Sequence, residues 1–436
     1  MRYEVTIEDT GVPHGIRSIT EQLPPIEKIH TGDEIKYRFR PGEFVFLTGL
    51  VLLAAWRKRL PQGVVVRVDD SSCFDAVKKF LTNTGFREIV DTGHEHPSVQ
   101  RRIGKVPLQP ITNRFNKEAT VADITNIFEE YAGQVKDTNP FKTLLSELCE
   151  NVLAHSESTS PGYVCARVLE NNLKAEIAIA DTGIGMLESF LRGTNEAAKE
   201  RIAKGAGAIE IAVDGLNSSK PIAPSGSLRS YYGFGLLITR RLIEENRGLL
   251  TIMSGNELLT IDRYQRNHVT LEHPWPGTFV GVVLDLGNPL PLEEIYEEAT
   301  SKIVPKTVSR APSTISTAKA HVHVSPLQAN AVITPEKGNQ AKKVELRHYG
   351  AELLTREAGT AVRADLASYI AAGNRILVSL EGVSDITPSV ADEAFGKLAE
   401  IIGFENFSEL VAFEGGQSIV RRLVEFVIKT RSRPLG

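Results

Sequence analysis

The sequence predicts an α/β protein of several domains, and three observations lead to this fold class. A chain of 436 residues normally divides into about two to four domains. Near both ends, over residues 44–85 and 361–403, short apolar runs typical of strands alternate with helical patterns. In the middle of the chain, two strand patterns over 162–181 lie between two amphipathic helical patterns.

The first of these segments reads as a small α/β unit. Residues 44–56 predict a strand, a turn and a helix, and residues 63–69 predict a second strand. Residues 73–84 predict a helix that ends at Gly85. This alternation indicates a sheet with some parallel pairing.

A helix with a polar stripe is predicted over residues 139–156. Asn139 is a good N-cap and Pro140 a good first helical residue. The apolar residues recur at intervals of three and four along one stripe, and they are Leu144, Leu145, Leu148, Val152 and Leu153. Glu147, Asn151 and His155 are spaced four apart and form another stripe. A carboxylate and a carboxamide one turn apart can polarise a water and hold Mg²⁺, as phosphoryl transfer requires.

A hairpin pattern follows that helix and ends on a carboxylate. Residues 162–169 and 175–181 are rich in apolar and β-favouring residues, and a short polar turn joins them. Asp181 stands at the end of the second strand, where it can accept a hydrogen bond from an exocyclic amine such as that of adenine. Gly183 and Gly185 then let the backbone turn and come close to a ligand.

A third pattern, over residues 232–243, has two glycines that open an apolar-periodic helix. Gly233 and Gly235 place backbone N–H groups and the positive helix end where phosphates can bind. Such a glycine pair is weak evidence alone, but here it is the third of three patterns in a fixed order.

Together the three patterns resemble the GHKL superfamily, the ATP-binding domain of gyrase, heat-shock chaperones, histidine kinases and MutL. Glu147 and Asn151 match its N box, and Asp181, Gly183 and Gly185 match its first glycine box. The resemblance implies a Bergerat-type α/β sandwich with a mixed sheet covered on one face by helices. It also implies that Asn151 binds Mg²⁺, Glu147 activates the nucleophile and Asp181 recognises the adenine of ATP.

The rest of the resemblance runs to residue 286. The second glycine box matches Gly233, Phe234, Gly235 and Leu236. Residues 249–255 and 280–286 resemble the strands that follow, and Thr278 lies in the late Gly-Thr element between them. The resemblance implies that residues 186–232, which include Lys199, Lys204 and Lys220, form a mobile ATP lid.

Both flanking segments resemble STAS domains. The expected domains are 1–110, STAS-like; 111–303, ATP-binding; 304–343, a linker without periodicity; and 344–436, a second STAS-like domain. In anti-sigma-factor antagonists a serine at the strand-to-helix junction accepts phosphate. Ser389, or more weakly Thr387, matches that position, although a structural role is the favoured reading.

Three functions remain open. The favoured one is an ATPase switch, in which Glu147 activates water. The alternatives are a protein serine/threonine kinase of the anti-sigma type that modifies a STAS-domain serine, and an ATP sensor that does not hydrolyse. A histidine kinase is disfavoured because no histidine lies between residues 97 and 154.

Charge, cysteine content and hydropathy indicate which classes of partner and which cellular compartment to expect. The formal net charge is −4 and well mixed, which does not indicate nucleic acid or an anionic membrane. The three cysteines, Cys73, Cys149 and Cys165, lack metal-ligand spacing and suggest reduced core residues. No signal peptide and no apolar run long enough to span a bilayer is evident, so we expect a cytoplasmic protein. From the family we expect a homodimer that contacts a protein partner through its STAS-like domains.

Overall fold

The computed structural model describes most of the chain. The described residues are 1–11, 13–40, 45–94, 104–131, 139–155, 162–169, 173–193, 195–214, 234–288, 290–291, 294–295, 341–353 and 356–431. They form two compact units, one up to residue 291 and one from residue 294 on. The protein is α/β, with several sheets and helices in both units.

The first unit begins with a small three-stranded layer. Its elements are β1 (Arg2–Ile7), α1 (His14–Gln22), β2 (Glu34–Phe39), α2 (Leu47–Arg57), β3 (Val65–Asp69), α3 (Asp75–Asn83) and α4 (Phe86–Thr92). The strands pair in the order β1-β2-β3, and both pairs are parallel. The expected parallel α/β unit is therefore confirmed, while β1, α1 and β2 were not predicted.

One local prediction in this layer is wrong. Residues 45 and 46 are not in a strand, and α2 begins at Leu47, so that Thr48 and Gly49 lie inside the helix instead of in a turn. Gly49 is there because of a close approach: a Cβ at this position would lie 2.6 Å from the Cβ of Thr10. Glycine here marks tight packing rather than a chain reversal.

The second part of this unit is a five-stranded sheet. Its strands are β4 (Lys105–Ile111), β5 (Gly162–Leu169), β6 (Lys174–Ala180), β7 (Leu249–Ile261) and β8 (Arg266–Asp285), in the order β4-β5-β6-β8-β7. All pairs among these described strands are antiparallel, so the expected mixed sheet is wrong. The short connections from β5 to β6 and from β7 to β8 explain two of these pairs, because such turns join antiparallel neighbours only.

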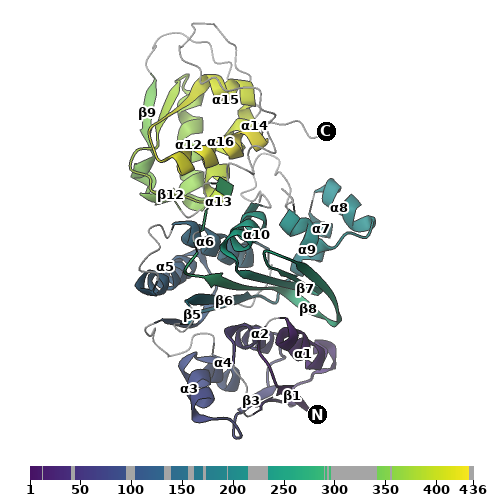
Figure 1. The fold of residues 1–436 in the computed structure, drawn as a ribbon. Helices are drawn as coiled ribbons and strands as arrows, with labels where there is room; N and C mark the ends of the chain where they lie inside the picture. Colours follow the sequence, from purple (N-terminus) through teal and green to yellow (C-terminus); the bar gives the residue numbers. More distant parts are fainter. Residues whose placement is uncertain are drawn as a thin grey trace. The chain divides into compact units, whose positions relative to one another are not determined.

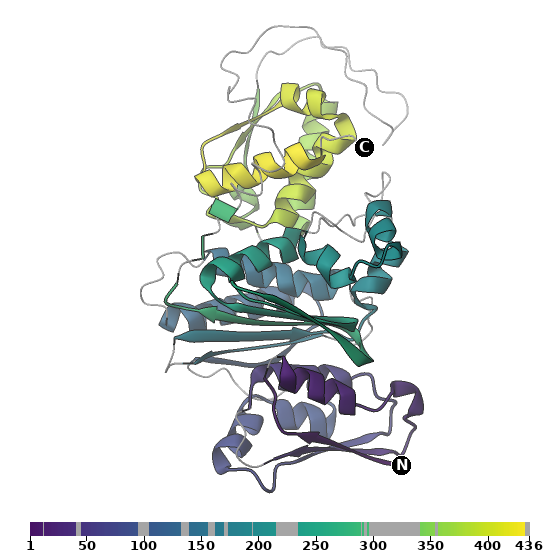
Figure 2. The ribbon, with the colours of Figure 1, turned by 45° about the vertical axis from the view of Figure 1, so that its right-hand side comes forward.

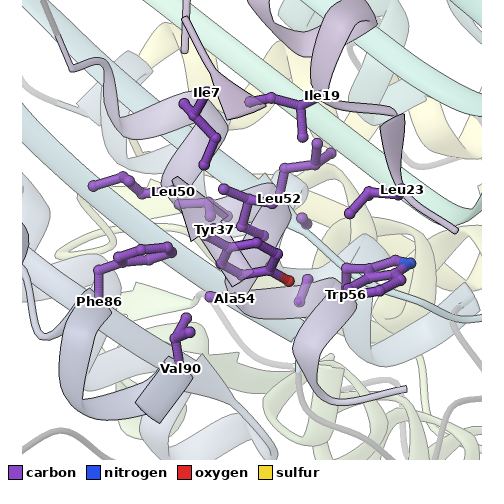
Figure 3. Close-up of a cluster of buried hydrophobic side chains, with 14 of the residues drawn as sticks. Ile7, Ile19, Leu23, Tyr37, Leu50, Leu52, Ala54, Trp56, Phe86 and Val90 are labelled. Carbon is purple, nitrogen blue, oxygen red and sulfur yellow. The ribbon is translucent and has the colours of Figure 1, made fainter. Parts of the chain in front are cut away.

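Helices cover both faces of the five-stranded sheet (Figures 1 and 2). On one face lie α5 (Arg114–Tyr131), α6 (Asn139–His155) and α10 (Phe234–Asn246). On the other face α1 and α2 pack against β5, β6 and β8, so the expectation of helices on one face is incomplete. One continuous core joins the three-stranded layer to this sheet, and Figure 3 shows part of it around Tyr37, Leu52 and Trp56.

The second unit holds another parallel layer. Its elements are β9 (Lys342–Glu345), β10 (Glu352–Leu353), α12 (Arg356–Ala371), β11 (Ile376–Ser379), β12 (Asp385–Ile386), α13 (Pro388–Ala391), α14 (Lys397–Ile402), α15 (Phe404–Leu410), β13 (Val411–Glu414) and α16 (Ser418–Arg431). The strands pair in parallel as β13-β11-β9 and as β10-β12. The expected helix over 388–402 forms with a π-helical turn at Asp392–Gly396, and it stops at Gly403, whose φ is +83°.

Among the residues that the structure describes, no helix is both long and apolar enough to cross a membrane.

Candidate functional site

The helix α6 forms where the sequence predicts it and carries the first group of site residues. Leu144, Leu145 and Leu148 are buried, and the helix packs on β4, β5 and β6 and between α5 and α10. Glu147 and Asn151, one turn apart, are only partly buried. The side chain of His155 lies outside the described residues.

The neighbouring carboxylates of α6 occupy different environments. The Glu150 carboxylate is buried and lies 2.8 Å from the Lys117 ammonium of α5, which is also buried. Glu150 thus joins α5 to α6, since a buried carboxylate needs a partner of opposite charge. Glu147 is the carboxylate of this turn that reaches the partly exposed surface.

Asp181 follows β6 directly, as predicted, and its side chain is buried. Burial raises its pKa to about 7, although backbone hydrogen bonds from Gly183 and Thr278 act in the opposite direction. Its Oδ1 accepts the Gly183 N–H at 2.8 Å. A buried carboxylate with so high a pKa has its charged form incompletely stabilised by the protein, and a donor from a ligand would supply what is missing.

Two glycines make room for this arrangement. A Cβ on Gly277, whose φ is +106°, would lie 2.4 Å from the Asp181 carbonyl oxygen and 2.7 Å from its Oδ1. A Cβ on Gly185, whose φ is +72°, would lie 2.9 Å from the Ser254 Oγ. No side chain fits at either position, so the backbones of segments distant in sequence approach one another closely.

Ser254 links the two glycine segments. Its hydroxyl donates to the Gly277 carbonyl at 2.8 Å and accepts the Met186 N–H at 2.8 Å. Thr278 pairs with Ser254 across β7 and β8, and its carbonyl accepts the Asp181 N–H at 2.8 Å. The structure therefore brings Asp181, Gly183, Gly185 and Thr278 together, and we call the set Asp181, Gly183, Gly185, Ser254, Gly277 and Thr278 the glycine cradle.

The helix α6 meets this cradle at the start of β5. A Cβ on Gly162 would lie 2.4 Å from the Val152 Cγ1 and 3.6 Å from the Asp181 Cβ. Val152 follows Asn151 directly, so the turn that carries Asn151 lies beside the end of β6. The first two sequence patterns thus meet in one place.

The second glycine box is described only in part. Gly233 lies outside the described residues, and Phe234 and Gly235 begin α10 without described side chains. Leu236 packs beside a small core that includes Phe190, Ala198 and Ile211. Met186, next to Gly185, packs on the same core, which ties α10 to the cradle.

The described part of the expected lid is helical. Residues 185–214 hold α7 (Gly185–Arg192), α8 (Glu196–Ala203) and α9 (Ala208–Asp214), packed around the small core. Lys199 and Lys204 pair with Glu196 and Glu200 of the same helix, and Lys220 lies outside the described residues.

The last helix of this region, α9, is held at both ends. Glu257 of β7 accepts the N–H groups of Ala208 and Ile209, at 2.9 and 3.4 Å. Asp214 pairs with Arg240 at 3.0 Å and with Arg266 at 2.7 Å. These contacts fix α9 on β7, β8 and α10 up to residue 214.

Three residues at the cradle were missed by sequence reasoning. They are Thr182, Ser254 and Trp275. The buried Thr182 hydroxyl has no hydrogen-bond partner among the described residues, and the Trp275 indole N–H donates to the Asp181 carbonyl at 3.2 Å. A glycine inside a strand pattern is a signal for a bulge, and the pairing of β7 with β8 does shift between Ser254 and Gly255. Nothing in the sequence around Thr182 or Trp275 points to these contacts.

In the second unit, Thr387 is fully buried. Its hydroxyl accepts the Val390 N–H at 3.3 Å, and its own N–H donates to the Leu353 carbonyl at 3.1 Å. Thr387 therefore acts as the N-cap of α13 and is not exposed for modification. Ser389 lies in α13, but its side chain is outside the described residues.

Comparison with known proteins identifies part of the second unit. Residues 358–420 match a family described as a STAS-like domain of unknown function (DUF4325). No GHKL family model matches the chain. A comparison with curated proteins finds no match. Residues 358–420, which run from α12 to the first residues of α16, are thus similar to a STAS-like domain, as the sequence indicated for this end of the chain.

Proposed function

We propose that the first unit binds ATP at the glycine cradle and hydrolyses it as a regulatory switch. The observation that carries this proposal is the buried Asp181 carboxylate, with its pKa raised to about 7, beside the Thr182 hydroxyl, which has no hydrogen-bond partner in the described part of the chain. Both are polar groups that a ligand with a donor edge would satisfy. The exocyclic amine of adenine can donate to the Asp181 carboxylate, and an adjacent ring nitrogen can accept from the Thr182 hydroxyl.

The residues also fit Mg²⁺ with its water shell. Among the described residues there is no group of three His, Cys, Asp or Glu side chains that could hold a metal alone. Mg²⁺ does not require one, because with a nucleotide it takes one or two protein oxygens and phosphate oxygens and keeps waters. The Asn151 carboxamide oxygen would hold it. When bound, the ion neutralises charge on the phosphates.

In this proposal each residue has one role. Asp181 accepts a hydrogen bond from the amine and orients the base. Glu147 takes a proton from water, whose oxygen forms a bond to the γ-phosphorus while the bond from that phosphorus to the bridging oxygen breaks and ADP leaves. Glu150 is excluded from the proton transfer because it is buried against Lys117.

The test follows free phosphate and protein-bound label from γ-labelled ATP with Mg²⁺. We expect the wild type to release free phosphate. We expect Glu147→Ala to bind ATP without turnover, because the substitution removes the general base but no contact to the adenine or the phosphates. Glu118→Ala, an exposed carboxylate of α5, is the matched control and should be unchanged. Loss of binding in Glu147→Ala would refute its role.

A protein serine kinase is the second candidate, because the same chain carries a segment similar to a STAS-like domain. Glu147 would then deprotonate a serine hydroxyl instead of water. Label retained on the protein and lost in Ser389→Ala would support this candidate. If ATP binds but neither free phosphate nor labelled protein forms, the protein is a nucleotide sensor. In each case the STAS-like segment is the proposed contact for a protein partner, and a homodimer stays a prediction.

A further inference from the structure

The three-stranded layer is fastened to the back of the five-stranded sheet by a buried polar contact. Glu176 of β6 accepts the Leu47 N–H at 3.0 Å, at the N-terminus of α2. The Arg167 Nε lies 2.7 Å from the same carboxylate, and its Nη1 donates to the Val45 carbonyl at 3.2 Å. A negative charge at a helix N-terminus is favourable, so Glu176 holds α2 on β6.

Separation of this layer from the sheet would be costly. Glu176 and Arg167 are 2% and 5% exposed, and burial raises the Glu176 pKa. Opening the contact would leave charged groups without their partners. The layer and the sheet therefore share one core, in which Ile19 and Trp56 of the layer are joined with Met253 and Trp275 of the sheet. Figure 3 shows the layer's side of this core.

Trp275 connects that shared core to the glycine cradle. Its indole is 1% exposed, and its Nε1–H donates to the Asp181 carbonyl at 3.2 Å. The same backbone is held on its N–H side by the Thr278 carbonyl. A second connection runs beside it: the Thr20 hydroxyl of α1 contacts the Met253 sulfur at 3.6 Å, and Met253 precedes Ser254 of the cradle.

We propose that Trp275 is a positioning residue for Asp181, and that through it the packing of the three-stranded layer on the sheet sets the affinity for nucleotide. The inference rests on the proposed function, because it concerns the same site. A shift of the layer moves the indole, the indole moves the Asp181 carbonyl, and the carboxylate then leaves the position in which it meets the base. The layer is thereby an input domain for the switch.

Hydrogen exchange tests the positioning role without nucleotide. Trp275→Phe keeps an aromatic ring but removes the donor to Asp181, whereas Trp56→Phe makes the same change in the same core away from the cradle. In the full-length protein we expect exchange over residues 181–186 to be about fivefold faster in Trp275→Phe only, as the loss of one neutral hydrogen bond implies. Equal exchange in the two variants would overturn the proposal.

Nucleotide affinity tests the consequence. We expect Trp275→Phe to bind ATP about fivefold more weakly and to discriminate less between ATP and GTP, with both values unchanged in Trp56→Phe. Faster exchange with unchanged ATP affinity would overturn the link to binding. If the wild type itself fails to bind ATP, the proposed function falls, while the exchange result still decides the positioning role.

A measurement on the unsubstituted protein covers the case in which Trp275→Phe does not fold. The chain has two tryptophans, so 5-fluorotryptophan gives two ¹⁹F resonances, assigned with Trp56→Phe. We expect the Trp275 resonance to move with a midpoint near the Asp181 pKa of about 7, and to move on addition of ATP. A Trp275 resonance that stays unchanged when ATP binds would overturn the proposal.

Discussion

Nucleotide affinity should depend on pH through Asp181, and the direction follows from its burial. The pKa of this carboxyl is raised from 3.8 to about 7, so the ionised form is lost as the pH falls through 7. Only the ionised carboxylate can accept from an amine with either oxygen. Binding therefore favours the ionised form, and affinity should be greatest above pH 7 and decrease below it.

The magnitude follows from the same pKa. At pH 6 about one tenth of the protein would have Asp181 ionised, which reduces the apparent affinity about tenfold, and each further pH unit adds about 1.4 kcal/mol. Calorimetric titration with ATP and Mg²⁺ from pH 5.5 to 8.5 measures the slope. Asp181→Asn is the control, because protonation of the nucleotide affects both proteins equally.

The wild type should show a slope that Asp181→Asn lacks, and Asp181→Asn should bind adenine nucleotide weakly at every pH. Equal slopes in the two proteins would refute the reasoning. Unchanged affinity in Asp181→Asn at pH 8 would show that the site is misplaced.

Two further predictions concern stability and are measured by urea unfolding. Gly277→Ala should destabilise the first unit by about 3 kcal/mol or more, because the new Cβ meets the Asp181 backbone at 2.4 Å in addition to the strain of a positive φ. The control is Gly205→Ala, where φ is +90° and the space around the new Cβ is open. It carries the strain alone and should cost only about 1 kcal/mol. Equal losses would show that the close contact relaxes. Lys117→Met should cost about 3–5 kcal/mol because Glu150 loses its buried ammonium partner, and Lys117→Met with Glu150→Leu should recover most of that loss. No recovery in the double variant would mean that packing, not charge, sets the cost.

The sequence predicted best where local chemistry decides the structure. The helix α6 begins at Asn139 because that residue and Pro140 suit a helix start, and β5 spans Gly162–Leu169 as its apolar run indicates. Asp181 was recognised as a strand-end carboxylate. Its partners within the cradle come from β7 and β8, and their approach depends on strand register, which no local pattern specifies.

The parts that were missed depend on tertiary contacts. The long hairpin of β7 and β8 contains Pro274 and Pro276, which argue locally against a central strand, yet β8 runs through both. The sequence held one signal for the second covered face of the sheet, the largely apolar runs of β5 and β6, which the structure buries almost throughout. Such runs are typical of strands with both faces buried, although they do not reveal that α1 and α2 provide the cover.

The most direct test of the central claim is a crystal structure of the full chain with Mg²⁺ and a non-hydrolysable ATP analogue. We predict the exocyclic amine within hydrogen-bond distance of the Asp181 carboxylate and the ion at the Asn151 carboxamide. Nucleotide bound elsewhere, or a glycine cradle that stays empty at saturating analogue, would contradict the proposal.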